Sequence, residues 1–281
     1  MRAIDMHVHP GTREYLVEGG GDYLSAAMDY FHKHDAVVSL DEMAAVYRRA
    51  DMMAVLLAWD AETHTGCPKV SNDYVADAVK KYPDVFLGFA SVDPWKGEMA
   101  IKELKRAVLE LGLRGLKCHP IAQAFYPNDR HFYPLWETCN ELKIPVLFHT
   151  GMTGVGAGTP GGCGLKLKYA RPIPYLDDVA ADFPHLTIIG AHPSWPWQEE
   201  MLALALHKTN VYIDLSGWSP KYFPPSLVQY ANTLLQDRVL FGSDYPFLTP
   251  ERWMNDFEKA GFRPEVHEKI LLLNAKRLLN L

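Results

Sequence analysis

Two histidines near the start of the chain have the spacing of a metal-binding pair. His7 and His9 lie within Ile4–Pro10, where apolar and polar residues alternate, and a period of two is typical of a β-strand. Both imidazoles and Asp5 are therefore predicted on one face of this strand. The residues predicted on its other face are Ile4, Met6 and Val8. Two neutral imidazoles side by side at the end of a strand supply half of a four-ligand site for a divalent metal ion.

A His-x-His pair is weak evidence by itself, and the chain has a second one, His32 and His34, in a region without a strand pattern. The first pair gains weight because later strands also end in residues that bind metals or move protons. Three apolar runs end in this way, namely Ile144–His149, Leu186–His192 and Arg238–Asp244. A fourth run, Leu113–His119, carries Lys117 and His119 on one face.

The rest of the chain alternates between strand and helix patterns. The other runs of strand length are Met52–Trp59, Val85–Val92 and Val211–Leu215. Helical patterns cover Ser39–Ala50, Ser71–Tyr82, Lys96–Leu111, His131–Leu142, Tyr175–Phe183, Trp197–His207, Pro224–Gln236 and Pro250–Ala260. Eight strands alternating with eight helices predict a single (β/α)8 TIM barrel over residues 1–281, with a C-terminal helix from about Pro264. Residues 10–38, which include three consecutive glycines, are predicted to be an irregular insertion.

In such a barrel the carboxyl ends of all strands meet at one rim, where active sites lie. The side chains at the strand ends are His7, His9, His149, His192 and Asp244, which are widely separated in the sequence. The barrel therefore predicts that these five residues converge. A doubly wound open sheet is the alternative fold, but no G-x-G-x-x-G sequence follows a strand to support it.

Several motifs together resemble the amidohydrolase superfamily. They are His7–His9, Phe148–Gly151, Ala191–Pro193, Gly242–Pro246 and Asn274–Leu279. The chain is most similar to the branch that contains aminocarboxymuconate-semialdehyde decarboxylase and resorcylate decarboxylase, and the resemblance covers nearly its whole length. These motifs are specific for the fold and the metal site, and they do not identify the substrate.

The resemblance implies that one divalent ion is held by His7, His9, His149 and Asp244. Zn²⁺ is the expected ion, and Mn²⁺ or Fe²⁺ would suit the same ligands. His192 and Asp244 would then be the catalytic acid–base residues.

Other branches of the superfamily hold two metals bridged by a carbamylated lysine on the fourth strand. A two-metal site that uses Lys117 and His192 therefore stays open. In the branch that this chain resembles, Lys117 would instead bind a carboxylate or carbonyl group of the substrate. An ion pair inside the barrel is the structural alternative for this lysine.

Further residues are predicted to contact a small-molecule substrate. His119 lies beside Lys117 on the fourth strand, and Arg171 lies in the long glycine-rich loop 151–174, where it could pair with an anionic group. Trp218 and Tyr222 follow the seventh strand and belong to a set of aromatic residues that would suit a planar substrate.

The leading hypothesis from the resemblance is a metal-dependent hydrolase of a small aromatic or carboxylated compound. Metal-activated water would attack a carbonyl of a lactone, or cleave the C–C bond of an aryl β-ketoacyl thioester. The alternative is a metal-dependent non-oxidative decarboxylase, or carboxy-lyase, of an aromatic acid. A non-catalytic binding barrel is a third alternative, which the presence of all five metal-site residues disfavours.

Composition restricts the remaining functions. The 281 residues have a net charge of −6, which does not favour nucleic acid or a membrane surface as a partner. The apolar runs are too short to span a bilayer, and the first strand leaves no room for a signal peptide. The four cysteines show no C-x-x-C spacing, so reduced thiols in a cytoplasmic enzyme are expected. Relatives suggest a homodimer.

Overall fold

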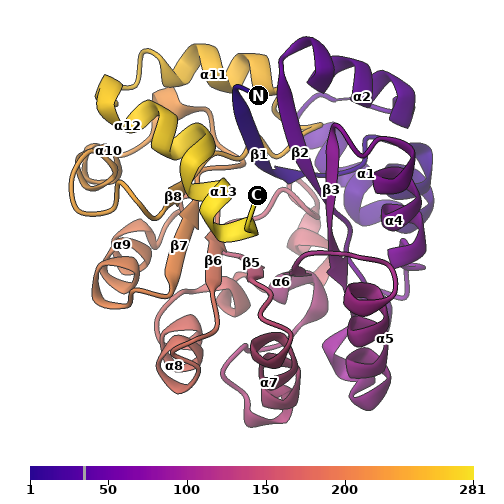
Figure 1. Cartoon of the computed structure of the whole chain (residues 1–281). Coiled ribbons are helices and arrows are strands. Elements are labelled where there is room, and N and C mark those ends of the chain that lie inside the picture. The colour runs from indigo at the N-terminus through magenta and orange to yellow at the C-terminus, as the bar shows by residue number, and fades with distance from the viewer. Residues whose placement is uncertain (34–35) are drawn as a thin grey trace.

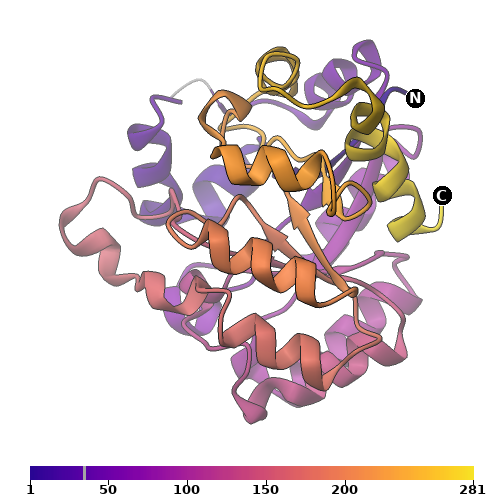
Figure 2. The same cartoon turned by 90° about the vertical axis from the view of Figure 1, so that its left-hand side faces the viewer.

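The chain folds as a barrel of parallel strands surrounded by helices (Figure 1 and Figure 2). The computed structural model describes residues 1–33 and 36–281, so that His34 of the second His-x-His pair lies outside the described residues. The strands, paired in chain order, are β1 (Ala3–Val8), β2 (Met52–Leu57), β3 (Phe86–Ser91), β4 (Leu116–Cys118), β5 (Val146–His149), β6 (Ile188–Ala191), β7 (Val211–Asp214) and β8 (Val239–Leu240).

Backbone hydrogen bonds close the ring between the first and last strands. Met6 N donates to Phe241 O at 2.9 Å, and His9 N donates to Tyr245 O at 2.8 Å. Because this closure joins β1 to the chain that follows β8, it brings His7 and His9 next to Asp244. The predicted barrel is confirmed.

Helices follow each strand and cover the outside of the barrel (Figure 1). They are α1 (Gly21–Tyr30), α2 (Leu40–Arg49), α3 (Glu62–Thr65), α4 (Asn72–Lys81), α5 (Glu98–Leu109), α6 (Pro120–Gln123), α7 (Tyr133–Glu141), α8 (Tyr175–Asp182), α9 (Gln198–His207), α10 (Pro225–Ala231), α11 (Pro250–Phe257), α12 (Pro264–Glu268) and α13 (Asn274–Leu279). Among the described residues, no helix is long and apolar enough to cross a membrane.

The helix-start signals in the sequence operate as predicted. Ser39 Oγ accepts a hydrogen bond from Glu42 N at 3.2 Å, and Glu42 Oε2 accepts one from Ser39 N at 2.8 Å, which is a complete capping box for α2. Ser71 Oγ accepts from Tyr74 N at 3.1 Å at the start of α4. Helix ends are less accurate: the pattern predicts a helix over 224–236, whereas α10 ends at Ala231 and turns follow.

The segment predicted to be irregular, 10–38, is largely helical, so that prediction is wrong. A π-helical segment covers Glu14–Gly19, and α1 follows directly. Apolar side chains drive this order, because Leu16 and Leu24 are buried in the main core. The glycines that suggested a loop sit at the junction of the two helical pieces, where Gly21 has a φ of +49°.

The alternation predicted for β1 is also wrong in part. Its pairing with β2 shifts register between Asp5 and Val8, an irregularity of the β-bulge kind. Ile4 and Met6 belong to a buried cluster that includes Leu57, whereas Val8 belongs to a separate, larger cluster. The three apolar side chains therefore do not share one face.

Asp5 is separated from the histidine pair by the same shift. Its carboxylate accepts hydrogen bonds from the Tyr47 hydroxyl of α2 at 2.9 Å and from the Ser243 hydroxyl at 2.6 Å. It therefore stabilises the ring closure and does not join His7 and His9. Bulges often redirect side chains at barrel rims, and here the shift turns both imidazoles toward the same site.

The C-terminal helix packs against the first and last strands. Leu272, Ala275 and Leu279 share a buried cluster with Ile4 and Leu240. Figure 1 shows α13 crossing the end of the barrel nearest the viewer. This leaves the opposite end, where the strands finish, for the functional residues.

One network on the outer surface ties α4 to α5. Arg106 Nη2 lies 2.6 Å from Asp73 Oδ2, and Arg106 Nε lies 2.8 Å from Glu103 Oε2. Hydrogen bonds from this guanidinium lower the pKa of both carboxyl groups.

Candidate metal centre

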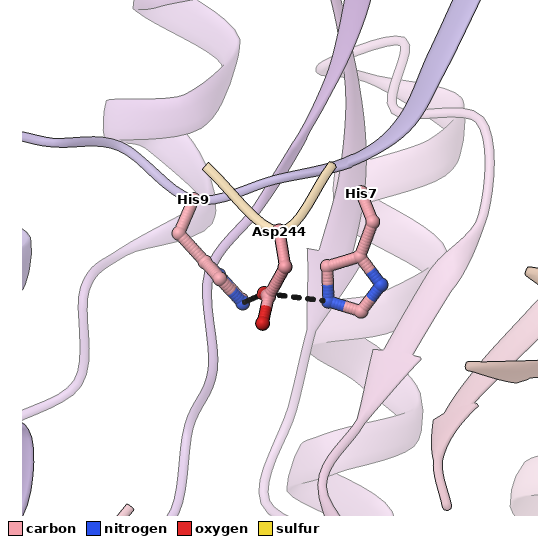
Figure 3. A group of neighbouring side chains, drawn as sticks. All are labelled: His7, His9 and Asp244. Carbon is pink, nitrogen blue, oxygen red and sulfur yellow. Dashed lines mark ion pairs between the residues drawn. The ribbon is translucent and has the colours of Figure 1, made fainter. Parts of the chain in front are cut away.

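Three of the predicted ligands meet where the barrel closes. Ligand atoms of His7, His9 and Asp244 all lie within 4.8 Å of one another, and Figure 3 shows the carboxylate between the two imidazoles. Asp244 Oδ1 is 3.6 Å from His7 Nε2 and 3.4 Å from His9 Nε2. Burial works to raise the pKa of Asp244, but the nearby side chains of His9, His192 and Lys117 lower it overall, so the group is a carboxylate.

The outward nitrogens of both imidazoles are held by oxygen acceptors. His7 Nδ1 lies 2.6 Å from Asp214 Oδ2, and His9 Nδ1 lies 2.7 Å from the backbone oxygen of Leu57. Each acceptor fixes a proton on Nδ1 and leaves the lone pair on Nε2, which is the usual arrangement of metal-binding histidines. The donor set therefore fits a divalent ion.

His149 lies apart from the three-residue group but has an unused lone pair. Its Nδ1 is 2.9 Å from His192 Nε2, and its Nε2 is buried with no hydrogen-bond partner among the described residues. Burial lowers the pKa of His149 and of His7, so both rings are neutral. Because buried polar atoms are normally satisfied, a metal ion is a fitting partner for this nitrogen, and the ligand role of His149 stays a prediction.

His192 follows β6 and contacts His7, His149 and Ser216. Its Nδ1 is 3.0 Å from Ser216 Oγ, and its ring centre is 4.9 Å from that of His7. Burial lowers the pKa of His192 to about 4, so the ring is neutral at pH 7. The structure places this predicted acid–base residue beside the candidate ligands.

Lys117 is buried in the same site. Its Nζ lies 3.0 Å from His7 Nε2, so it occupies the lone pair that a metal ion would use. Burial lowers the pKa of this ammonium group. The position suits either of the roles predicted for Lys117, as a second-metal ligand or as a substrate contact, and neither role is tested.

Sequence reasoning missed several residues of the site. Asp214 ends β7 and holds His7, and Ser216 Oγ donates to Asp214 Oδ2 at 2.9 Å. The signal was available, because Asp214 ends a strand as His149 does. Tyr15, whose hydroxyl lies 2.9 Å from His9 Nδ1, comes from the segment wrongly predicted as irregular.

A cavity of about 310 Å³ opens above these residues. Its walls are mainly apolar and aromatic, with Tyr15, Phe31, Trp59, Trp218, Tyr222 and Phe247 among the lining residues. Lys117 and Arg252 also line it, and among the described residues Asp244 is the one acidic side chain that does so. The cavity thus favours a small ligand with a planar apolar part and a negative charge.

The other predicted substrate contacts have different outcomes. Lys117, His119, Trp218 and Tyr222 line the cavity, and the ring of His119 stacks on that of His149 at 4.0 Å. Arg171 is not brought to the cavity.

The half-exposed guanidinium of Arg171 is held by Glu200, with 2.6 Å between Nη2 and Oε1. The arginine that does line the cavity is Arg252, in the first turn of α11. Sequence reasoning missed Arg252 because no motif distinguishes it from other surface arginines.

Comparisons with known proteins agree with this architecture. Curated relatives include a gamma-resorcylate decarboxylase of Polaromonas, 25% identical over 99% of this chain and 98% of the relative. A 2-amino-3-carboxymuconate-6-semialdehyde decarboxylase of Dictyostelium discoideum is 33% identical over 75% of this chain and 65% of the relative.

Solved structures also match over the full length. An uncharacterised TIM-barrel protein of Bordetella bronchiseptica has a TM-score of 0.82 and 26% identity, with 100% of this chain and 99% of that one covered. A dihydroxybenzoic acid decarboxylase of Polaromonas, with bound manganese, has a TM-score of 0.69 and 22% identity, covering 99% and 97%. The model of the amidohydrolase family matches residues 4–281, and the chain therefore belongs to the amidohydrolase family.

Proposed function

We propose that this protein is a metal-dependent non-oxidative decarboxylase of an aromatic acid. The observation that carries the proposal is the composition of the cavity. Aromatic side chains and several imidazoles line it, and Lys117 and Arg252 contribute positive charge. A planar acid would place its ring against the aromatic side chains and its carboxylate near positive charge. The curated relatives named above are decarboxylases, which supports the same reaction class.

Hydrolysis, the leading hypothesis from the sequence, has less support. Two curated relatives are cited above, one that matches over nearly the full length and one with the higher identity. Both are decarboxylases and not hydrolases. The non-catalytic alternative is also disfavoured, because the chain belongs to an enzyme family. The small-molecule substrate and the homodimer remain proposals.

The metal would be held by His7, His9 and Asp244, with His149 as the fourth predicted ligand. When bound, a divalent ion supplies positive charge that orients and polarises oxygen atoms of the substrate. Relatives support a divalent ion without fixing its identity: Zn²⁺ is our expectation, and the solved Polaromonas decarboxylase contains manganese. Mn²⁺ and Fe²⁺ are therefore to be tested beside it.

The protein must also move one proton, because decarboxylation replaces the carboxylate on a ring carbon by hydrogen. His192 and Asp244 both line the cavity and carry atoms that can hold that proton. Ser216 Oγ, 3.0 Å from His192 Nδ1, orients the imidazole so that its Nε2 faces His149. We therefore propose His192 as the acid–base residue and Asp244 as its partner.

A single assay separates the two reactions. The metal-loaded protein is incubated in ¹⁸O-water with a panel of hydroxybenzoates and with lactones. Release of CO₂ with no ¹⁸O in the organic product is the expected result. Incorporation of ¹⁸O into the organic product, with no CO₂, would establish hydrolysis instead.

A further inference from the structure

Tyr15 lies against His9 in a way that constrains its hydroxyl proton. The side chain is buried, and its ring stacks on that of His9 with centres 5.1 Å apart and planes at 12°. Tyr15 Oη is 2.9 Å from His9 Nδ1, and the residue lines the cavity. The direction of this hydrogen bond determines what the hydroxyl can offer a ligand.

The backbone oxygen of Leu57 settles that direction. It lies 2.7 Å from the same nitrogen, His9 Nδ1. A carbonyl oxygen only accepts hydrogen bonds, so His9 Nδ1 carries the proton. Tyr15 therefore cannot donate to this nitrogen. Its oxygen instead accepts from His9 Nδ1–H, in a bifurcated hydrogen bond that the Leu57 oxygen also accepts. The assignment uses protein atoms alone and does not depend on a bound metal.

The hydroxyl proton of Tyr15 is then left without an acceptor. Within residues 1–33 and 36–281, Tyr15 Oη forms one hydrogen bond, and its partner is His9 Nδ1. Buried hydroxyl donors are normally satisfied, and the cavity is the space that this side chain borders. We propose that Tyr15 is a ligand-binding residue whose hydroxyl donates into the cavity to an acceptor oxygen of the substrate held beside His9.

This inference rests on the proposed function and makes it more specific. Since Tyr15 contacts His9, the acceptor must lie at the metal end of the cavity and not at its mouth. The ligand is thus an aromatic acid that presents a carboxylate or an adjacent ring oxygen to both the metal site and Tyr15. Apolar aromatic compounds of the same size would leave the donor unpaired and would be rejected.

The direct test compares Tyr15→Phe with the wild-type protein. This substitution keeps the stacked ring and removes the hydroxyl alone. Calorimetry with metal-loaded protein and 2-hydroxybenzoate should give a dissociation constant at least about tenfold higher for Tyr15→Phe, as for loss of a hydrogen bond to a charged group. The Tyr133→Phe variant is the control, because it removes a hydroxyl that bonds to Asp182 outside the cavity. Equal affinities of Tyr15→Phe and wild type would overturn the proposal.

A second measurement does not need the substrate class to be right. A high-resolution crystal structure of the metal-loaded, ligand-free protein should show a water within hydrogen-bond distance of Tyr15 Oη on the cavity side. The Leu57 oxygen should still accept from His9 Nδ1. A Tyr15 hydroxyl bonded to a protein acceptor instead would overturn the inference. If no hydroxybenzoate binds the wild-type protein, the proposed function fails, and this structure still decides the role of Tyr15.

Discussion

Replacing Asp214 by asparagine should weaken metal binding although Asp214 is not a predicted ligand. Asp214 Oδ2 accepts from His7 Nδ1, and Asp214 Oδ1 accepts from the backbone N–H of Ser216 at 3.0 Å. A carboxylate accepts at both oxygens, whereas an amide accepts at one and donates at the other. The Asp214→Asn variant therefore cannot satisfy both neighbours.

The two amide orientations predict the size of the effect. If the new NH₂ group faces His7, it donates to Nδ1 and moves the imidazole proton to Nε2, so the lone pair for the metal is lost. If it faces Ser216 instead, two N–H groups oppose each other at a buried position, which costs about 1 to 3 kcal/mol. Loss of such an outer contact lowers metal affinity by about 10- to 100-fold, or about 1.4 to 2.8 kcal/mol.

The measurement is a competition titration of Zn²⁺ and of Mn²⁺ against a chelating indicator. Asp182→Asn serves as the matched control, since that carboxylate accepts from Tyr133 at a distance from the cavity. Thermal unfolding of the metal-free proteins checks that each variant folds. A folded Asp214→Asn protein whose metal affinity lies within about twofold of the wild type would show that the proton positions assigned to His7 are wrong.

Three other outcomes are expected. Arg252→Gln should raise KM for an aromatic acid by about fivefold with little change in kcat, since an exposed charge pair contributes at most about 1 kcal/mol. The control, Arg171→Gln, should leave KM unchanged. His192→Ala should retain a full complement of metal by elemental analysis and lose turnover, and loss of one of two ions would instead support a two-metal site. Arg106→Gln should destabilise the protein by at most about 1 kcal/mol at pH 7 in urea unfolding. Because its two carboxylate partners have lowered pKa values when folded, that difference is present above about pH 4.5 and should be lost as the pH falls through the lowered pKa values.

The sequence predicts the barrel well because each strand and helix carries its own pattern. Buried runs of strand length and capped amphipathic helices repeat along the chain, so small errors at their ends do not change the topology. That His7, His9 and Asp244 lie at the same rim follows from topology, since parallel strands in a ring finish at one end. Knowledge of which strands end in polar residues therefore predicts that these three side chains meet.

The substrate contacts were less predictable because they depend on surface loops and on pairing. Arg171 and Arg252 look alike in the sequence, but Glu200 holds the first and no described side chain holds the second. Tyr15 was missed because consecutive glycines suggested a loop where buried apolar residues order a helix. Long-range partners decide both cases, and a local pattern does not contain them.

The metal site also depends on a local irregularity that contradicts the simplest strand pattern. A strand with regular alternation would place Asp5 on the same face as His7 and His9, and its carboxylate would compete for the same ion. The register shift in β1 sends Asp5 to Tyr47 and Ser243 instead, where it helps to hold the closure that positions Asp244. The irregularity therefore separates a structural carboxylate from a candidate ligand. A substitution that restored regular pairing in β1 would disrupt the site even if every ligand were kept.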